Sequence, residues 1–285
     1  MLEREEHIEQ AYLFKALIER GRQNVATQDL LLSLKEEILA TSKLALAIDY
    51  LLSELKHAGV LSTAMGRMAH YFTPFQTFVI AEAEKDRGRF DFFMALEILR
   101  REAEYRAAGA TRQGVFLYEF ESLSRNRLGY DHGLDAVAAD PTFDEAWKNW
   151  IVTVRRQIGL VEIADMIYVR SEYFQKVQKQ RGHESPPEAP ILFGEKEGRI
   201  AFANRRKDPL YFFAAINRQL GYPEVPRQKP IDETPQIIPT LLRRVERLET
   251  RIKFLEEEQK GGIDITKLYA KPIQPPNWTD DPPTL

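Results

Sequence analysis

Apolar residues recur at helical spacing almost without interruption over residues 2–181. Side chains three or four positions apart share one face of an α-helix, so this spacing predicts helices that each bury one stripe. Thr73-Pro74 predicts a helix start with threonine as the cap, and Gly129 predicts a helix end. The connections are short, which is typical of an antiparallel multi-helix bundle or array. The sequence therefore predicts a mainly α fold, with a helical domain over 1–181.

The composition changes in residues 182–230. The segment Ser-Pro-Pro-Glu-Ala-Pro at 185–190 is typical of a linker. Residues 191–194 and 198–203 are consistent with two short strands that form a hairpin, and Pro209 opens a further helix. We therefore expect a linker and a small basic module over 182–230.

A heptad pattern marks residues 231–260 and is the strongest local signal in the chain. The heptad residues are Ile238, Val245 and Ile252 at the a positions, and Leu241, Leu248 and Leu255 at the d positions. β-Branched residues at a with leucine at d favour a parallel two-stranded coiled coil, because the two layers pack with different geometry. The sequence predicts a coiled-coil helix here, followed by a proline-rich disordered tail over 261–285.

The charges beside the heptad seam agree with a parallel pair. Each g residue of a parallel dimer faces the e residue five positions later in the partner. Arg244 would face Glu249, and Arg251 would face Glu256, whereas an antiparallel pair would set arginine against arginine. The pattern is short, and an isolated helix of this length is marginal in water. Two interpretations stay open: the stripe pairs two copies as a homodimer, which the charges favour, or it packs on its own domain.

Composition excludes several classes of protein. The net charge of −3 argues against broad nucleic-acid binding by the whole chain, since such binding needs a basic surface. The chain has no cysteine, which excludes disulfides, cysteine-ligated zinc and iron–sulfur clusters. The polar, acidic opening predicts no secretory signal, and the lack of a long apolar run predicts no membrane association. We expect a cytoplasmic protein.

Polar residues that could carry chemistry gather between two predicted helices. The candidates are Arg125, Arg127, Asp131 and His132. The arginines could hold an anion, and the aspartate–histidine pair could transfer a proton. In the alternative interpretation this is a helix end, with Gly129 as its cap and the arginines complementing the helix dipole.

One sequence feature suggests a metal site, but only in part. Glu54 and His57 have the Glu-x-x-His spacing of di-iron helical bundles. Such a site needs a second copy of the motif, and none of the other histidines has glutamate three residues before it. No phosphate-binding loop, zinc-protease or serine-hydrolase motif occurs. The sequence therefore assigns no catalytic residue, no metal ligand and no cofactor.

The small module has eight basic and four acidic residues between positions 190 and 230. The basic residues are Lys196, Arg199, Arg205, Arg206, Lys207, Arg218, Arg227 and Lys229. With Phe202, Tyr211 and Phe212 among them, they are consistent with a surface for nucleic acid or an acidic protein. A solvated face around a small satellite core is the alternative.

The opening residues 1–12, MLEREEHIEQAY, resemble uncharacterised bacterial proteins of no assigned activity. So do residues 209–215, PLYFFAA, and residues 221–226, GYPEVP. The resemblance covers most of the chain up to the heptad helix. It implies a bacterial cytoplasmic protein and indicates no activity.

These patterns favour one function over two others. The first is a non-catalytic interaction or scaffold protein, in which the heptad helix of 231–260 pairs two copies and the rest meets a protein partner. The second is a nucleic-acid-associated protein that uses the basic residues of 196–229. The third is an enzyme with its site near Arg125 to His132.

Overall fold

A computed structural model describes residues 2–23, 25–38, 42–85, 90–182, 189–227 and 234–259, and within them it contains fourteen α-helices and no strand. The first seven are α1 (Arg4–Gly21), α2 (Thr27–Glu37), α3 (Lys43–Ala58), α4 (Leu61–Arg67), α5 (Pro74–Ala83), α6 (Phe92–Ala107) and α7 (Arg112–Arg125). The others are α8 (Tyr130–Ala138), α9 (Glu145–Gln157), α10 (Ile163–Val169), α11 (Glu172–Gln180), α12 (Glu195–Ala203), α13 (Pro209–Leu220) and α14 (Thr234–Gln259). The mainly α fold is confirmed.

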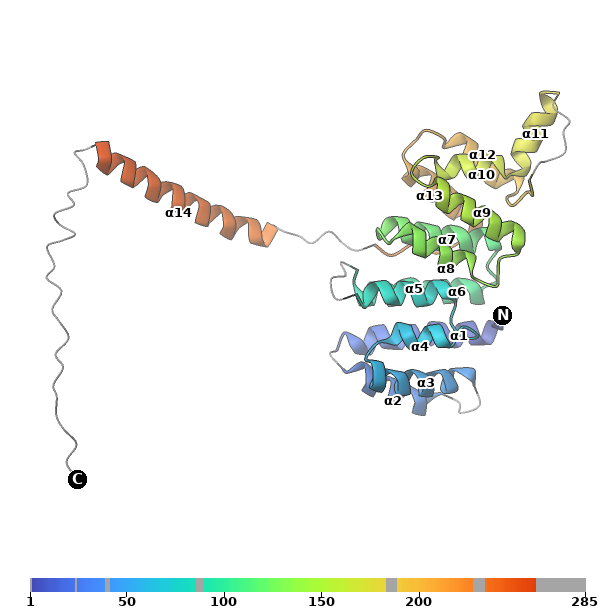
Figure 1. Ribbon diagram of the computed structural model, residues 1–285, viewed down its shortest axis with the longest axis horizontal. Helices are drawn as coiled ribbons and strands as arrows, with labels where there is room; N and C mark the ends of the chain where they lie inside the picture. The colour runs from blue at the N-terminus through green and yellow to red at the C-terminus, as the bar shows by residue number, and fades with distance from the viewer. Residues whose placement is uncertain are drawn as a thin grey trace. The chain divides into compact units, whose positions relative to one another are not determined.

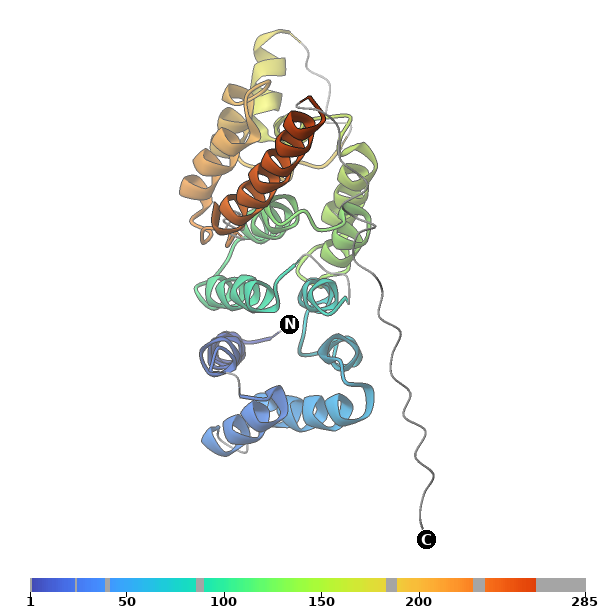
Figure 2. The ribbon, with the colours of Figure 1, turned by 90° about the vertical axis from the view of Figure 1, so that its left-hand side faces the viewer.

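The first eight helices stack in layers (Figures 1 and 2). Helices α2 and α3 form one end, α1 and α4 come next, then α5 and α6, and then α7 and α8. The chain doubles back in this stack, because α1 packs along α6 while α4 packs against α5. Helices that are distant in sequence, such as α1 and α6, therefore lie side by side in the array.

The start of α5 illustrates how local sequence fixes these ends. Thr73 Oγ1 accepts a hydrogen bond from the Gln76 N–H, and the Gln76 side chain accepts one from the Thr73 N–H, each at 3.2 Å. This reciprocal capping box, with Pro74 as the first helical residue, confirms the predicted helix start. It also fixes the turn between α4 and α5, which lines the cavity described below.

The expected hairpin at 191–194 and 198–203 is wrong, because residues 195–203 form helix α12. Gly198 lies inside this helix, and a Cβ at that position would be 2.2 Å from Ser171 Oγ. The glycine therefore allows close packing of α12 on the start of α11, rather than a turn between strands. Phe193, from the first expected strand, forms an isolated parallel bridge with Ser171 instead.

The described residues as far as Arg227 belong to one compact unit, Met1–Gln228, and helix α14 belongs to a second unit that begins at Lys229. The small module expected over 182–230 is thus part of the first unit as far as Gln228. Phe193 explains part of this packing, since its ring centroid lies 5.2 Å from those of both Trp147 and Trp150 in α9. The side chain of Asn126 also donates a 3.1 Å hydrogen bond to the carbonyl of Pro226.

Helix α14 covers most of the predicted heptad segment 231–260. Val245, Leu248, Ile252 and Leu255 are each about half exposed. The side chains of Ile238 and Leu241, and the predicted tail over 261–285, lie outside the described residues. None of the helices in the described ranges is both long and apolar enough to cross a lipid bilayer.

Candidate functional site

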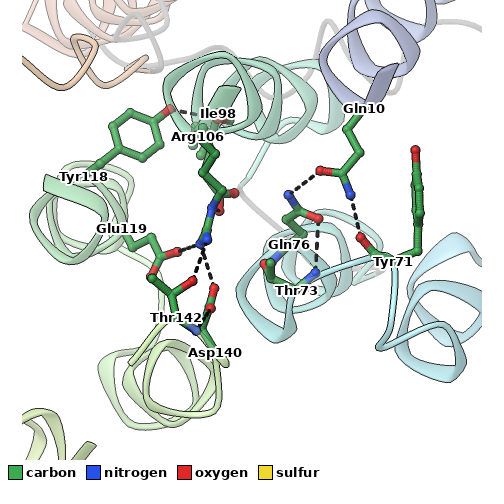
Figure 3. A network of polar contacts seen from close by, with 11 residues as sticks. Gln10, Tyr71, Thr73, Gln76, Ile98, Arg106, Tyr118, Glu119, Asp140 and Thr142 are labelled. Atoms are coloured by element: carbon green, nitrogen blue, oxygen red, sulfur yellow. Dashed lines mark hydrogen bonds and ion pairs between the residues drawn. The ribbon is translucent and has the colours of Figure 1, made fainter. Parts of the chain in front are cut away.

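A buried arginine lies at the carboxyl end of α6, among acidic groups from three parts of the array (Figure 3). The Arg106 side chain is 7% exposed. Its Nε donates to Glu102 in the preceding turn at 2.7 Å, and its Nη2 donates to Glu119 in α7 at 2.9 Å. Nη2 also donates to Asp140 at 2.6 Å, and Nη1 donates to Thr142 at 3.0 Å. One guanidinium thereby joins α6, α7 and the loop between α8 and α9.

Three carboxyl groups around one guanidinium leave an excess of acid. Burial raises the pKa of Glu119 well above its usual range, and the nearby charges of Glu102 and Asp140 add to the effect of burial. Burial also raises the pKa of Glu102. For Arg106, burial alone would lower the pKa, but the surrounding carboxylates outweigh it and raise the pKa. The arginine therefore stays charged, and the glutamates favour retaining a proton.

Two carboxyl oxygens of the cluster have no partner. The Oε2 atoms of Glu102 and Glu119 are both buried, and neither has a hydrogen-bond partner among the described residues. Because burial and the like charges of Glu102 and Asp140 raise the pKa of Glu119 well above its usual range, a proton on Glu119 is favoured.

Local turns hold the other members of this cluster. Asp140 Oδ1 accepts a 2.7 Å hydrogen bond from the Thr142 N–H, which is an Asx-type turn that shapes the loop before α9. Tyr118, in α7, donates from its hydroxyl to the carbonyl of Ile98 in α6 at 2.8 Å. The first bond fixes the Asp140 carboxylate, and the second ties α7, which carries Glu119, to α6.

A second buried polar network lies beside the first and ties α1 to the α4–α5 turn (Figure 3). Gln10 Nε2 donates to the Tyr71 carbonyl at 2.6 Å, and Gln76 Nε2 donates to Gln10 Oε1 at 3.4 Å. Gln10 and Gln76 are both fully buried. Because the capping box also involves Gln76, the turn and α1 are held as one unit.

A cavity of about 300 Å³ takes its lining from both networks. Its polar lining includes His7 from α1, Thr73 from the α4–α5 turn, and Arg106, Asp140 and Thr142 from the buried cluster. Burial lowers the pKa of His7, and the positive charge of Arg106 lowers it further, so the imidazole is neutral at pH 7. His7 Nδ1 is buried and has no hydrogen-bond partner in the described part of the chain.

The residues predicted near 125–132 lie at the end of α7, in the connection that follows it, and in the first turn of α8. Arg125 forms an ion pair with Glu121 one turn earlier in α7. Arg127, Asp131 and His132 are exposed, and none of the three lines a cavity described here. The predicted helix end at Gly129 is wrong, because α7 ends at Arg125 and Gly129 is instead the N-cap of α8.

The basic residues of 196–229 are partly neutralised by neighbours. Arg199 pairs with Glu195 at 2.7 Å, and Arg205 pairs with Asp165 while its guanidinium lies 5.1 Å from the ring centroid of Tyr168. Lys229 lies outside the described residues. Phe202 and Tyr211 are exposed, whereas Phe212 is buried.

Glu54, which belongs to the incomplete Glu-x-x-His motif, forms an ion pair with Arg67. Glu54 accepts a 2.7 Å hydrogen bond from Arg67 Nη1. Over the described ranges, no three His, Asp or Glu side chains gather where they could hold a metal ion. The structure thus gives Glu54 a structural partner on α4.

Sequence reasoning missed the whole Arg106 cluster. Glu102 and Arg106 have the i, i+4 spacing of an ordinary solvated helix pair, which gave no signal of burial. Comparison of the chain with protein-family models, with curated proteins and with solved structures found no match.

Proposed function

We propose that this protein is a non-catalytic scaffold in which α14 pairs two copies of the helical array as a parallel coiled coil. One observation supports this most strongly. Val245, Leu248, Ile252 and Leu255 form a heptad stripe on α14, and their side chains are 49%, 52%, 54% and 59% exposed. A contiguous aliphatic stripe exposed to this degree is typical of a surface that meets a partner.

Pairing would bury the exposed part of these side chains. Burying a valine, leucine or isoleucine completely contributes about 1.5–3 kcal/mol, so covering the remaining half contributes about 1 kcal/mol for each side chain. Both copies contribute, and the total must offset the cost of bringing two chains together. The short helix therefore depends on its flanking charges for additional stability and for orientation.

The charges on α14 are consistent with the parallel arrangement. Arg244, Glu249, Arg251 and Glu256 are all exposed in α14. Each g arginine would lie near an e glutamate of a parallel partner, but near another arginine in an antiparallel one. The charges therefore favour a second copy of α14, in parallel orientation, as the partner that covers the apolar stripe.

Charge exchange on α14 tests both the pairing and its direction. Arg244→Glu with Arg251→Glu sets glutamate against glutamate in a parallel pair, so the dissociation constant should rise at least tenfold in sedimentation equilibrium. Adding Glu249→Arg and Glu256→Arg restores opposite charges at every g–e contact, with the same net charge as the natural chain.

The two variants are read together. Parallel pairing predicts that the double variant weakens the pair and that the four-fold variant recovers the affinity of the natural chain. An antiparallel pair already sets like charges together at g and at e in the natural chain, so a double variant that leaves the dissociation constant unchanged contradicts the parallel arrangement, and so does a four-fold variant that fails to recover. A natural chain that sediments as one copy at every concentration contradicts pairing altogether and favours packing of α14 on its own chain.

A further inference from the structure

We propose that the cavity lined by His7, Thr73, Arg106, Asp140 and Thr142 binds a small uncharged molecule that carries an amide group on an apolar body. The cavity belongs entirely to the Met1–Gln228 unit. The inference is therefore independent of pairing through α14, and each can fail without the other.

The first argument is unused hydrogen-bonding capacity at the cavity wall. A guanidinium has five N–H groups. In the described residues, those of Arg106 meet four acceptors: Glu102 from Nε, Thr142 from Nη1, and Glu119 and Asp140 from Nη2. One Nη1 N–H is therefore left over on a side chain that lines the cavity, and an oxygen acceptor of a ligand would satisfy it.

His7 supplies the complementary group. Its Nδ1 is buried without a partner among the described residues, and the side chain lines the same cavity. A neutral imidazole has one donor and one acceptor nitrogen. An amide offers a carbonyl oxygen and an N–H within one planar group, so it can meet Arg106 and His7 together.

The charges around the cavity disfavour both an anionic and a cationic ligand. An anion at Arg106 would meet Asp140 and the glutamate pair, which already exceed the charge of the guanidinium. A cation would meet the guanidinium itself, since Arg106 is part of the cavity wall. The site is thus balanced for an uncharged polar group, because either sign of ligand charge meets a like charge within the cluster.

The rest of the wall is suited to an apolar body. Leu2, Ala69, Ala110, Val115 and Pro141 form the apolar part of the lining, and His70 and Tyr71 complete it. A volume of about 300 Å³ is at the small end of ligand pockets, which hold one compact molecule. The polar groups are fixed by the two buried networks, so binding requires little rearrangement of the cavity.

Three probes of nearly equal shape test the proposal on the full chain: benzamide, benzoate and benzylamine. Binding is followed by NMR of labelled leucine, valine and alanine methyl groups. We expect saturable shifts at Leu2, Ala110 and Val115 with benzamide, and an affinity at least tenfold weaker for both charged probes. Absence of saturable benzamide shifts at these methyls overturns the proposal, and so does equal or tighter binding of either charged probe.

A cavity-filling variant provides the matched control. Ala110→Leu places added bulk in the cavity and should abolish benzamide binding, whereas Ala108→Leu, at an exposed position outside the lining, should leave it unchanged. Benzamide binding that survives Ala110→Leu places the probe elsewhere and contradicts the assignment. If Ala110→Leu fails to fold, the comparison of the three probes on the natural chain still decides the question.

Discussion

Arg106 and Asp140 are 34 residues apart in the chain, yet a 2.6 Å hydrogen bond joins Nη2 of the arginine to Oδ2 of the aspartate. The bond spans from the end of α6 to the loop between α8 and α9. The same guanidinium also binds Glu119 in α7, so one side chain connects three successive parts of the array. The packing of α6, α7 and the α8–α9 loop therefore depends on the buried positive charge of Arg106.

Removal of that charge should be costly. Arg106→Met keeps much of the aliphatic volume but leaves Glu102, Glu119 and Asp140 buried without a counter-ion. Breaking a buried ion pair from one side typically costs about 3–5 kcal/mol, and we expect a loss of this size in urea unfolding. Arg112→Met is the control, because Arg112 and Asp144 are each about half exposed, and such pairs contribute under about 1 kcal/mol. Equal losses in the two variants would contradict the role of the buried cluster.

Stability should depend on pH through Glu102 and Glu119, whose pKa values are raised in the folded protein. The folded state then binds more protons than the unfolded chain at pH values above about 4.5, the ordinary glutamate pKa. The stability contributed by these protons is complete below that pH and is lost as pH rises through the folded pKa values.

Glu119→Gln should remove most of that dependence. The amide can still accept the hydrogen bond from Arg106 and is uncharged, as the protonated carboxyl is. Thermal unfolding from pH 5 to pH 8 should show the variant gaining melting temperature relative to the natural chain as pH rises. Glu145→Gln, at a side chain 82% exposed, should follow the natural profile. If the melting temperatures of the natural chain and Glu119→Gln change with pH in the same way, Glu119 is not protonated in the folded protein.

The packing of α12 gives a separate test at Gly198. Alanine is favoured over glycine within a helix by about 1 kcal/mol. At this position, however, its Cβ would lie 2.2 Å from Ser171 Oγ and 2.5 Å from Ser171 Cβ. We expect Gly198→Ala to lower the free energy of unfolding by about 1–3 kcal/mol. Gly66→Ala is the control, because Gly66 lies inside α4 and a Cβ there would make only an ordinary 3.5 Å contact with Thr77 Cγ2, so this change should not lower the free energy of unfolding. A stabilising Gly198→Ala would contradict the close contact.

The position of Gly198 inside α12 also shows which features of the fold the sequence can predict. Helices and their starts follow from local patterns, as the Thr73 capping box illustrates, because the deciding atoms lie within one turn. The sequence predicts a strand from Gly198, because nothing in the neighbouring residues shows that this glycine is required by a close contact inside a helix. Ser171, which requires it, is 27 residues away in the sequence.

The same limit applies to the Arg106 cluster. Glu102–Arg106 and Arg100–Glu104 are both i, i+4 pairs on α6, but the first is buried while the second includes a glutamate side chain that is 50% exposed. Their local sequences do not distinguish them. Burial comes from α7 and the α8–α9 loop, so only the fold reveals that Arg106 has three acidic partners.

A single change on the heptad stripe should separate pairing from folding. Leu248→Asp places a charge at the central d position of α14 and should raise the dissociation constant of the pair at least tenfold. The melting temperature of the first unit should stay unchanged, because α14 belongs to the second. Lys253→Asp, at an exposed b position outside the seam, is the control. Loss of first-unit stability in Leu248→Asp would indicate that the stripe packs on the array instead.

The mass of the full chain in solution tests the central claim most directly. Static light scattering should give twice the 33.0 kDa of one chain for the full protein, and one copy for a chain stopped before Thr234. One copy in both samples, at concentrations up to the millimolar range, would contradict the proposal that α14 pairs two arrays.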